Sequence, residues 1–243
     1  MRAQYINSRT AMLVLLVIRM SAALSHWRRW PSVANYGKKR FDIHQSSLKK
    51  RQGLMTPHFF GFGSLVNTAT HVYGNTRPAR LEGWRRTWVR TPDRSMAFLS
   101  VTPAPGHVIE GLLAAVPNGD WAALDERETG YVRVDVTPQV AHDMAPAPQI
   151  SLYQVPEESH DRNARDHKIL LSYLDVVLRG YREVFGDTGA EAFMATTDGW
   201  DTPILNDRAT PYYPRHQVMT PDEHALHDAL IAEAGAQVLA GGE

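Results

Sequence analysis

Hydrophobic and polar positions change their spacing along the chain, from the short runs and alternation of strands to the three- and four-residue spacing of helices. Residues 58–66 form an apolar and aromatic run that turns glycine-rich midway, which predicts a buried strand entering a tight loop. Five later segments also predict strands, at residues 79–89, 96–102, 108–116, 131–136 and 150–155. The turn residues Pro105-Gly106 predict that 96–102 and 108–116 form a hairpin.

Helical spacing prevails in the second half of the chain. Residues 166–185 place their apolar side chains on one stripe, and Gly186 follows as a stop signal. Shorter helices are predicted at residues 121–127, with Asp120 as the N-cap, at 190–195 and at 221–236. Strands followed by helices predict an α+β fold whose antiparallel-rich sheet is either open or closed into a barrel.

The formal net charge of zero conceals two oppositely charged segments. Residues 1–54 hold eleven Lys and Arg against one acid, Asp42, a formal charge of +10, and the remaining residues carry −10. Segments so different in charge rarely share one folded unit. The sequence therefore predicts a basic leader at residues 1–54, outside the fold, and one folded domain at residues 55–243.

The basic leader is open to three interpretations. Its apolar run, residues 11–18, resembles the core of a signal peptide, but Arg19 interrupts it and it is too short to span a membrane. The clusters Lys38-Lys39-Arg40 and Lys49-Lys50-Arg51 suit a basic arm for nucleic acid or a membrane surface. We favour the third interpretation, upstream sequence ahead of a true start at Met55, because Met55 directly precedes the first predicted strand.

Residue types exclude several classes of site. The chain has no Cys, which excludes disulfides, thiol catalysis and Cys-ligated metals and fits a cytoplasmic location. Its eleven His form no metal-ligand pattern, and His224 and His227 lie three residues apart on a predicted surface helix. We expect no metal, no nucleic acid on the acidic body and no membrane association, and either a monomer or a homodimer.

Two short segments are candidate sites, and each also has an ordinary structural interpretation. Gly61-Phe62-Gly63-Ser64-Leu65 follows the first strand, where backbone N–H groups can turn toward a cavity, although a tight turn would have the same residues. Asp125, Glu126 and Glu128 crowd the end of a predicted helix, where the helix dipole disfavours negative charge and raises a carboxyl pKa. A solvated acidic helix end is the alternative. Residues 207–216 are either a lid or a rigid surface loop.

Five short motifs follow one another along the body. They are Phe60-Gly61-Phe62-Gly63-Ser64-Leu65, Leu81-Glu82-Gly83-Trp84-Arg85, Val108-Ile109-Glu110-Gly111-Leu112, Leu124-Asp125-Glu126-Arg127-Glu128 with Tyr131, and Ser172-Tyr173-Leu174-Asp175. In this order and spacing, they resemble the gamma-glutamylcyclotransferase / AIG2-like family from residue 58 to residue 200. The order of the motifs carries the resemblance, because each motif alone is short.

The resemblance implies a small mixed β-barrel of the α+β class with flanking helices, and an enzyme that needs no metal and no organic cofactor. It implies that Glu128 is the catalytic acid–base, which takes a proton from the α-amine of a gamma-glutamyl substrate and returns it to the leaving amine. The product would be 5-oxoproline. The resemblance also implies that the substrate is held by Gly61, Phe62, Gly63, Ser64 and Leu65.

One departure from the family pattern concerns Phe62, which stands where many members have tyrosine. The missing hydroxyl would then come from Tyr131, Tyr173 or Tyr212. The substrate stays open among gamma-glutamyl amino acids, gamma-glutamylamines and glutathione. A catalytically silent small-molecule-binding module on the same fold is the alternative function.

Overall fold

The computed structural model describes residues 56–241, except for residue 93 and residues 162–165. The predictions for the basic leader and for a start at Met55 fall outside the described residues. None of the helices in the described ranges is both long and apolar enough to cross a membrane.

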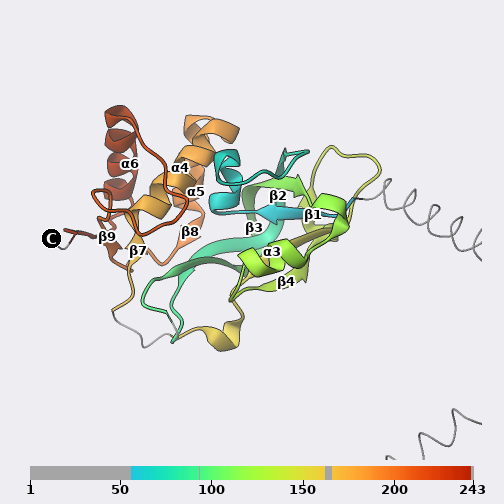
Figure 1. The fold of residues 1–243 in the computed structure, drawn as a ribbon, viewed down its shortest axis with the longest axis horizontal. Helices are drawn as coiled ribbons and strands as arrows, with labels where there is room; N and C mark the ends of the chain where they lie inside the picture. Colours follow the sequence, from blue (N-terminus) through green and yellow to red (C-terminus); the bar gives the residue numbers. More distant parts are fainter. Residues whose placement is uncertain (1–55, 93, 162–165, 242–243) are drawn as a thin grey trace, which may run out of the picture. The chain divides into compact units, whose positions relative to one another are not determined.

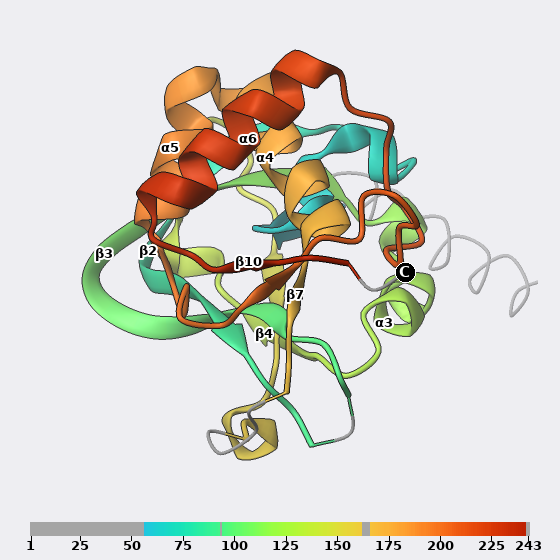
Figure 2. The same cartoon turned by 90° about the vertical axis from the view of Figure 1, so that its left-hand side faces the viewer.

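A curled sheet forms the centre of the domain (Figures 1 and 2). Antiparallel pairs dominate it, although β1 pairs in parallel with β6, and β8 with β2. β4 and β5 lie at the two ends of the strand order, so the sheet is a half-barrel, and the predicted α+β class is confirmed. The strands follow the order β4 (Val132–Asp135), β6 (Ile150–Gln154), β1 (His58–Gly61), β3 (Phe98–Ala115), β2 (Arg77–Val89) and β5 (Val140–Ala141), with β8 (Thr197–Asp198) beside β2.

Helices and a second, small sheet flank the curled sheet. The helices are α3 (Ala122–Arg127), α4 (Leu171–Phe185), α5 (Asp187–Ala195) and α6 (Pro221–Glu233). The small sheet contains β7 (Ile169–Leu170), β9 (Ile204–Leu205) and β10 (Val238–Leu239). Figures 1 and 2 show α4, α5 and α6 gathered on one side of the curled sheet, and α3 apart from them.

The predicted helix at residues 166–185 begins five residues later than expected. Residues 169–170 pair in parallel with β9, so their backbone groups belong to a strand and α4 starts at Leu171. Its end agrees with the prediction, because Gly186 has a φ of 77°, a left-handed conformation that glycine adopts without steric cost.

The predicted hairpin at Pro105-Gly106 is wrong. Residues 98–115 form one strand, β3, and both of its halves pair antiparallel with β2. The register shifts opposite Gly83, where extra residues of β3 bulge out of the ladder. Gly83 and Gly106 both have a positive φ, 81° and 83°, which fits the left-handed backbone of the bulge. A turn signal in the sequence thus marks a bulge here.

β1 is buried on both of its faces. Phe59 packs with Leu124 of α3 in one apolar cluster, while Phe60 belongs to a larger cluster that includes Leu174 of α4. All four residues of the strand are buried. This explains why the segment is a continuous apolar run instead of an alternation, and it fixes the position of the loop that follows at Gly61–Leu65.

A buried acidic side chain on α4, Asp175, joins three segments that are distant in the sequence. Its carboxylate accepts two hydrogen bonds from Arg208, at 2.8 Å each, and lies 2.9 Å from Nδ1 of His227. His227 is fully buried, so the prediction of a surface position for it is wrong: this face of α6 packs toward α4. The network holds the loop between β9 and α6, residues 206–220, against α4.

Candidate active site

Glu128 lies where α3 ends and the chain turns toward β4. Its N–H donates to the carbonyl of Leu124 at 3.0 Å, and its own carbonyl accepts from the N–H of Tyr131 at 3.0 Å. Gly130, with a φ of 96°, completes this turn. The turn directs Glu128 away from the exposed acids Asp125 and Glu126, and the Glu128 side chain is only 18% exposed.

Burial is the main influence on the Glu128 carboxyl. It raises the pKa of Glu128 above the ordinary value, since desolvation disfavours the charged form. Arg127 opposes this rise through its charge and through a hydrogen bond of 3.1 Å from Nε to Oε1, and Arg215 opposes it through its charge. The predicted direction is therefore confirmed, although its cause is burial, where the sequence had suggested the helix dipole.

The Gly61–Leu65 loop approaches Tyr173 of α4 closely at Gly63. A Cβ atom at Gly63 would lie 2.5 Å from the Tyr173 hydroxyl oxygen, so glycine leaves room for that hydroxyl. Burial raises the pKa of Tyr173 well above its ordinary value, and a hydrogen bond from the backbone of Ser64 partly opposes the rise. Tyr173 is therefore a neutral phenol at physiological pH, placed against the loop.

Phe62 turns its ring into the larger apolar cluster, where the residue is 7% exposed. Its carbonyl oxygen accepts hydrogen bonds from Nε of Arg86 at 3.1 Å and from the Tyr181 hydroxyl at 2.9 Å. Arg86 is fully buried, with its guanidinium 4.8 Å from the Tyr181 ring centroid and 5.0 Å from that of Phe193. The buried guanidinium of Arg86, held among carbonyls and aromatic rings, thus fixes the backbone of the Gly61–Leu65 loop at Phe62.

The predicted site residues line two adjoining hollows. The larger has a volume of about 300 Å³ and contains Ser64, Glu128, Tyr131 and Tyr173 in its wall. The smaller, about 40 Å³, shares these four residues and adds the rest of the loop, Gly61 to Leu65. The Tyr131 hydroxyl donates to the carbonyl of Leu99 at 3.0 Å. Tyr212, the remaining candidate for the hydroxyl, is 63% exposed and lines neither hollow.

Five polar residues of the larger hollow were not predicted as site residues: Arg94, Arg127, Thr129, Tyr213 and Arg215. Tyr213 packs edge-on against Tyr173, with ring centroids 5.0 Å apart, and its hydroxyl oxygen is buried. Asp207 fixes its loop, accepting from the Ser172 hydroxyl at 2.6 Å and from the Tyr212 N–H at 2.9 Å. The sequence did indicate residues 207–216 as a possible lid, through their mixture of aromatic and cationic side chains. The pattern alone did not show which part of the protein this loop contacts.

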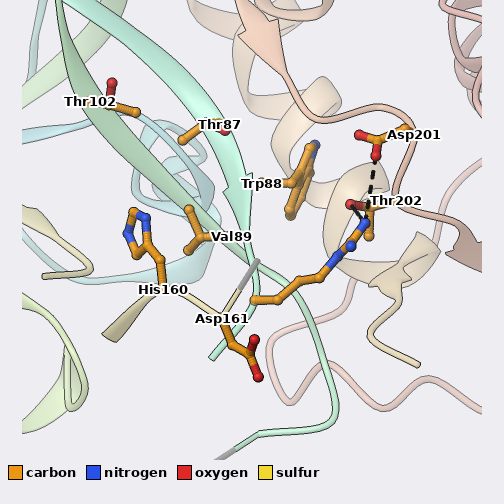
Figure 3. A pocket seen from close by; sticks show the side chains of 9 residues that line it. Thr87, Trp88, Val89, Thr102, His160, Asp161, Asp201 and Thr202 are labelled. Atoms are coloured by element: carbon orange, nitrogen blue, oxygen red, sulfur yellow. Dashed lines mark hydrogen bonds and ion pairs between the residues drawn. The ribbon is translucent and has the colours of Figure 1, made fainter. Parts of the chain in front are cut away.

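A second cavity, of about 320 Å³, shares no lining residue with the Glu128 hollow (Figure 3). Residues 87–90 form one of its walls, and Thr102, His160, Asp161, Asp201 and Thr202 complete it. Beside Asp201 and Thr202, the Arg90 guanidinium donates to the Thr202 hydroxyl at 2.9 Å and lies 3.7 Å from the Asp201 carboxylate. In the described ranges of the chain, no group of three or more His, Asp or Glu is placed to hold a metal ion.

The segment from Phe59 to Ser172 matches the family model "Gamma-glutamyl cyclotransferase, AIG2-like". This segment contains the glycine loop, Glu128 and Tyr131. This match confirms the family resemblance predicted from the sequence. The gamma-glutamyl cyclotransferase match ends one residue before Tyr173, and Tyr213 and Arg215 lie outside it.

Several solved structures are similar at low sequence identity. A gamma-glutamyl cyclotransferase is 14% identical, with 71% of this chain and 98% of that chain covered and a TM-score of 0.46. An uncharacterised protein from Homo sapiens is 15% identical, with 70% and 97% covered and a TM-score of 0.45. A gamma-glutamyl cyclotransferase specific to glutathione, from yeast, is 15% identical, with 73% and 95% covered and a TM-score of 0.34. No curated protein matches the sequence.

Proposed function

We propose that the domain is a gamma-glutamyl cyclotransferase in which Glu128 is the catalytic acid–base. One observation carries the proposal: a largely buried carboxyl with a raised pKa lines a hollow beside the Gly61–Leu65 loop, within the segment that matches the family. A carboxyl whose pKa moves toward neutrality can both accept and return a proton near pH 7.

The proposed reaction is an intramolecular acyl transfer. The α-amine nitrogen of the gamma-glutamyl group attacks the γ-carbonyl carbon, and Glu128 takes the proton that the nitrogen loses. The bond from the γ-carbon to the leaving nitrogen then breaks, and Glu128 returns the proton to that nitrogen. The products are 5-oxoproline and a free amine or amino acid, and no water is consumed. Both reacting groups belong to one molecule, so the hollow contributes mainly by holding it in a folded conformer.

Neutral phenols supply the polar contacts that Phe62 lacks. Burial raises the pKa of Tyr131 and of Tyr173, so both keep their proton. The Tyr213 hydroxyl is buried and has no hydrogen-bond partner among the described residues, which leaves it available to a substrate oxygen. A donor aimed at an oxygen that gains negative charge in the transition state contributes to catalysis.

The test is release of 5-oxoproline from a panel of gamma-glutamyl amino acids, gamma-glutamylamines and glutathione. Glu128→Gln keeps the shape of the side chain but cannot carry the proton, and we expect kcat to fall by about 10²–10⁴-fold. Glu126→Gln is the matched control, because Glu126 lies two residues earlier, in the last turn of α3, and is exposed. The control should keep the activity of the unmodified chain.

Two results would contradict the proposal in different ways. Turnover retained by Glu128→Gln, with an unchanged circular dichroism spectrum, would remove Glu128 from the catalytic role. No turnover of any compound by the unmodified chain, together with an increase in Tm on addition of one of them, would favour the silent binding module.

A further inference from the structure

His71 follows the glycine loop by six residues, and both nitrogens of its ring contact the backbone. Nε2 lies 3.0 Å from the carbonyl oxygen of Leu65, the last residue of the loop, and Nδ1 accepts from the N–H of Tyr73 at 3.2 Å. A backbone N–H can only donate, so Nδ1 carries a lone pair and Nε2 carries the proton that the Leu65 carbonyl accepts. The two contacts therefore define a neutral ring with its proton on Nε2.

A chain of hydrogen-bonded peptides leads from His71 to Tyr173. The C=O and N–H of a trans peptide point in opposite directions, so a bond at one end fixes the direction of the other. The peptide whose carbonyl His71 binds ends in the N–H of Val66, which donates to the carbonyl of Gly63 at 2.9 Å. The peptide of that carbonyl ends in the N–H of Ser64, and the Ser64 backbone is hydrogen-bonded to the Tyr173 hydroxyl. His71 thus determines how the loop meets Tyr173.

The segment that carries His71 also contacts the other half of the site. The hydroxyl of Thr70 donates to the carbonyl of Ser64 at 2.9 Å. Its own carbonyl accepts from Nη1 of Arg127 at 3.3 Å, and Nε of the same guanidinium is 3.1 Å from Oε1 of Glu128. The pair Thr70-His71 therefore lies between the glycine loop and the ion pair of the proposed acid–base.

The surroundings of His71 disfavour a second proton on its ring. From β1, Phe59 packs edge-on against it with ring centroids 6.3 Å apart, and the Tyr73 ring lies at 5.1 Å. Burial lowers the pKa of His71 below 6.5; the bond to the Leu65 backbone opposes this, and the charge of Arg127 on α3 adds to it. A proton on Nδ1 would face the N–H of Tyr73, donor against donor. The ring would then have to give up one of its two contacts.

We propose that His71 is a positioning residue for the reaction at the Glu128 hollow: its neutral ring fixes the Gly61–Leu65 loop against Tyr173, and protonation of the ring releases the loop. This inference rests on the proposed function and adds a residue that lines neither hollow. His71 acts through the loop that would bind the substrate, so its loss should affect KM more than kcat. The loop is fixed at physiological pH and is released as pH falls through the lowered pKa of His71.

Two amide variants separate the contacts of the ring. His71→Gln can extend an N–H donor to the Leu65 carbonyl and never carries a charge, whereas His71→Asn is too short to reach that carbonyl. With gamma-glutamyl-alanine at pH 7.5, we expect His71→Asn to lower kcat/KM about fivefold, the net contribution of one hydrogen bond, mainly by raising KM. His71→Gln should stay within about twofold of the unmodified chain.

The pH profile distinguishes positioning from a purely structural role. As pH falls below 6.5, the ratio of kcat/KM of His71→Gln to that of the unmodified chain should rise toward about fivefold. Titration of Glu128 cancels in this ratio, because both chains contain Glu128. His107→Gln is the matched control, since His107 is exposed on β3 and its ring lies 3.5 Å from Arg85; its ratio should stay near one at every pH. A ratio for His71→Gln that does not change with pH would overturn the inference.

NMR of the full, unmodified chain without substrate tests the same inference independently of turnover. The neutral His71 ring should carry its proton on Nε2, and the backbone amide signals of Ser64 and Val66 should shift with the titration of that ring. A neutral ring protonated on Nδ1, or amide signals that do not follow the ring, would also overturn it. Amide signals that follow the ring, in a chain that turns over no gamma-glutamyl compound, would refute only the proposed reaction.

Discussion

The Glu128 hollow and the cavity of Figure 3 have almost the same volume, about 300 and 320 Å³, but their polar groups are partnered differently. In the cavity of Figure 3, Arg90 reaches Thr202 and Asp201, whose side chain is 83% exposed. In the Glu128 hollow, burial raises the pKa of a carboxyl, and among the described residues the Tyr213 hydroxyl has no hydrogen-bond partner and the guanidinium groups of Arg94 and Arg215 have no ion-pair partner. Volume therefore does not distinguish the two, whereas a desolvated carboxyl and a buried phenol without a partner among the described residues do, since perturbed groups in a hollow mark a functional site.

Among the substitutions that test the difference between the two cavities, Gly63→Ala is expected to lower kcat/KM the most. The added Cβ atom would lie 2.5 Å from the Tyr173 hydroxyl and 3.2 Å from Cδ2 of Leu99, so the phenol must move away from the loop. A displacement of this size can lower kcat/KM by about 10²-fold. Steady-state kinetics would measure it. Gly74→Ala is the matched control, because nothing lies within 4 Å of a Cβ atom at Gly74. Equal kcat/KM for the two variants would show that the position of Tyr173 does not matter for the reaction.

The pH dependence of stability should reveal the raised pKa of Glu128. Its folded-state pKa is raised above 4.5, so the folded chain holds this proton more tightly than the unfolded chain. Stability is therefore lost as pH rises between 4.5 and the raised pKa, and Glu128→Gln removes that loss. We expect Glu128→Gln to be more stable than the unmodified chain at pH 7 in urea unfolding, with the difference vanishing below pH 4.5.

The change in the free energy of unfolding depends on how far the pKa of Glu128 is raised. Each tenfold change in proton affinity between the folded and unfolded chain corresponds to about 1.4 kcal/mol. The same pKa governs activity, so the acid limb of kcat/KM against pH should lie above pH 4.5. Glu126→Gln, at an exposed carboxyl, should show neither effect. A stability gap that widens at low pH would mean that Glu128 is held as a carboxylate in the fold.

Local sequence was enough to predict β1 and the glycine loop, because each depends on its neighbours in the chain, whereas the role of Glu128 was implied by the family resemblance and stays a prediction. The apolar run of β1 and the two glycines of the loop require nothing distant to be recognised. The turn at Gly130, three residues after the short helix α3, similarly signals that Glu128 leaves the helix face that carries Asp125.

The remaining features depend on tertiary packing that no local pattern records. Tyr213 and Arg215 reach the hollow only because Asp207 and Arg208 hold their loop to α4. The alternation on either side of Pro105-Gly106 is the same for a hairpin and for one bulged strand; pairing with β2 decides between them. His227 occupies a helix with little amphipathic contrast in its sequence, and its burial follows from Asp175, which is 52 residues away.

Asp201→Asn should have the smallest effect on kcat/KM, and it tests the cavity of Figure 3. Asp201 lies 3.7 Å from Arg90, and an exposed pair of this kind contributes about 0–1 kcal/mol to stability. Because this cavity shares no residue with the Glu128 hollow, kcat/KM should change by less than about twofold, within what is expected of a surface substitution. Kinetics with gamma-glutamyl-alanine and a urea unfolding curve would measure both quantities. A tenfold fall in kcat/KM at unchanged stability would show that the Arg90–Asp201 pair influences the reaction, and that lack of a partner is not what separates the two cavities.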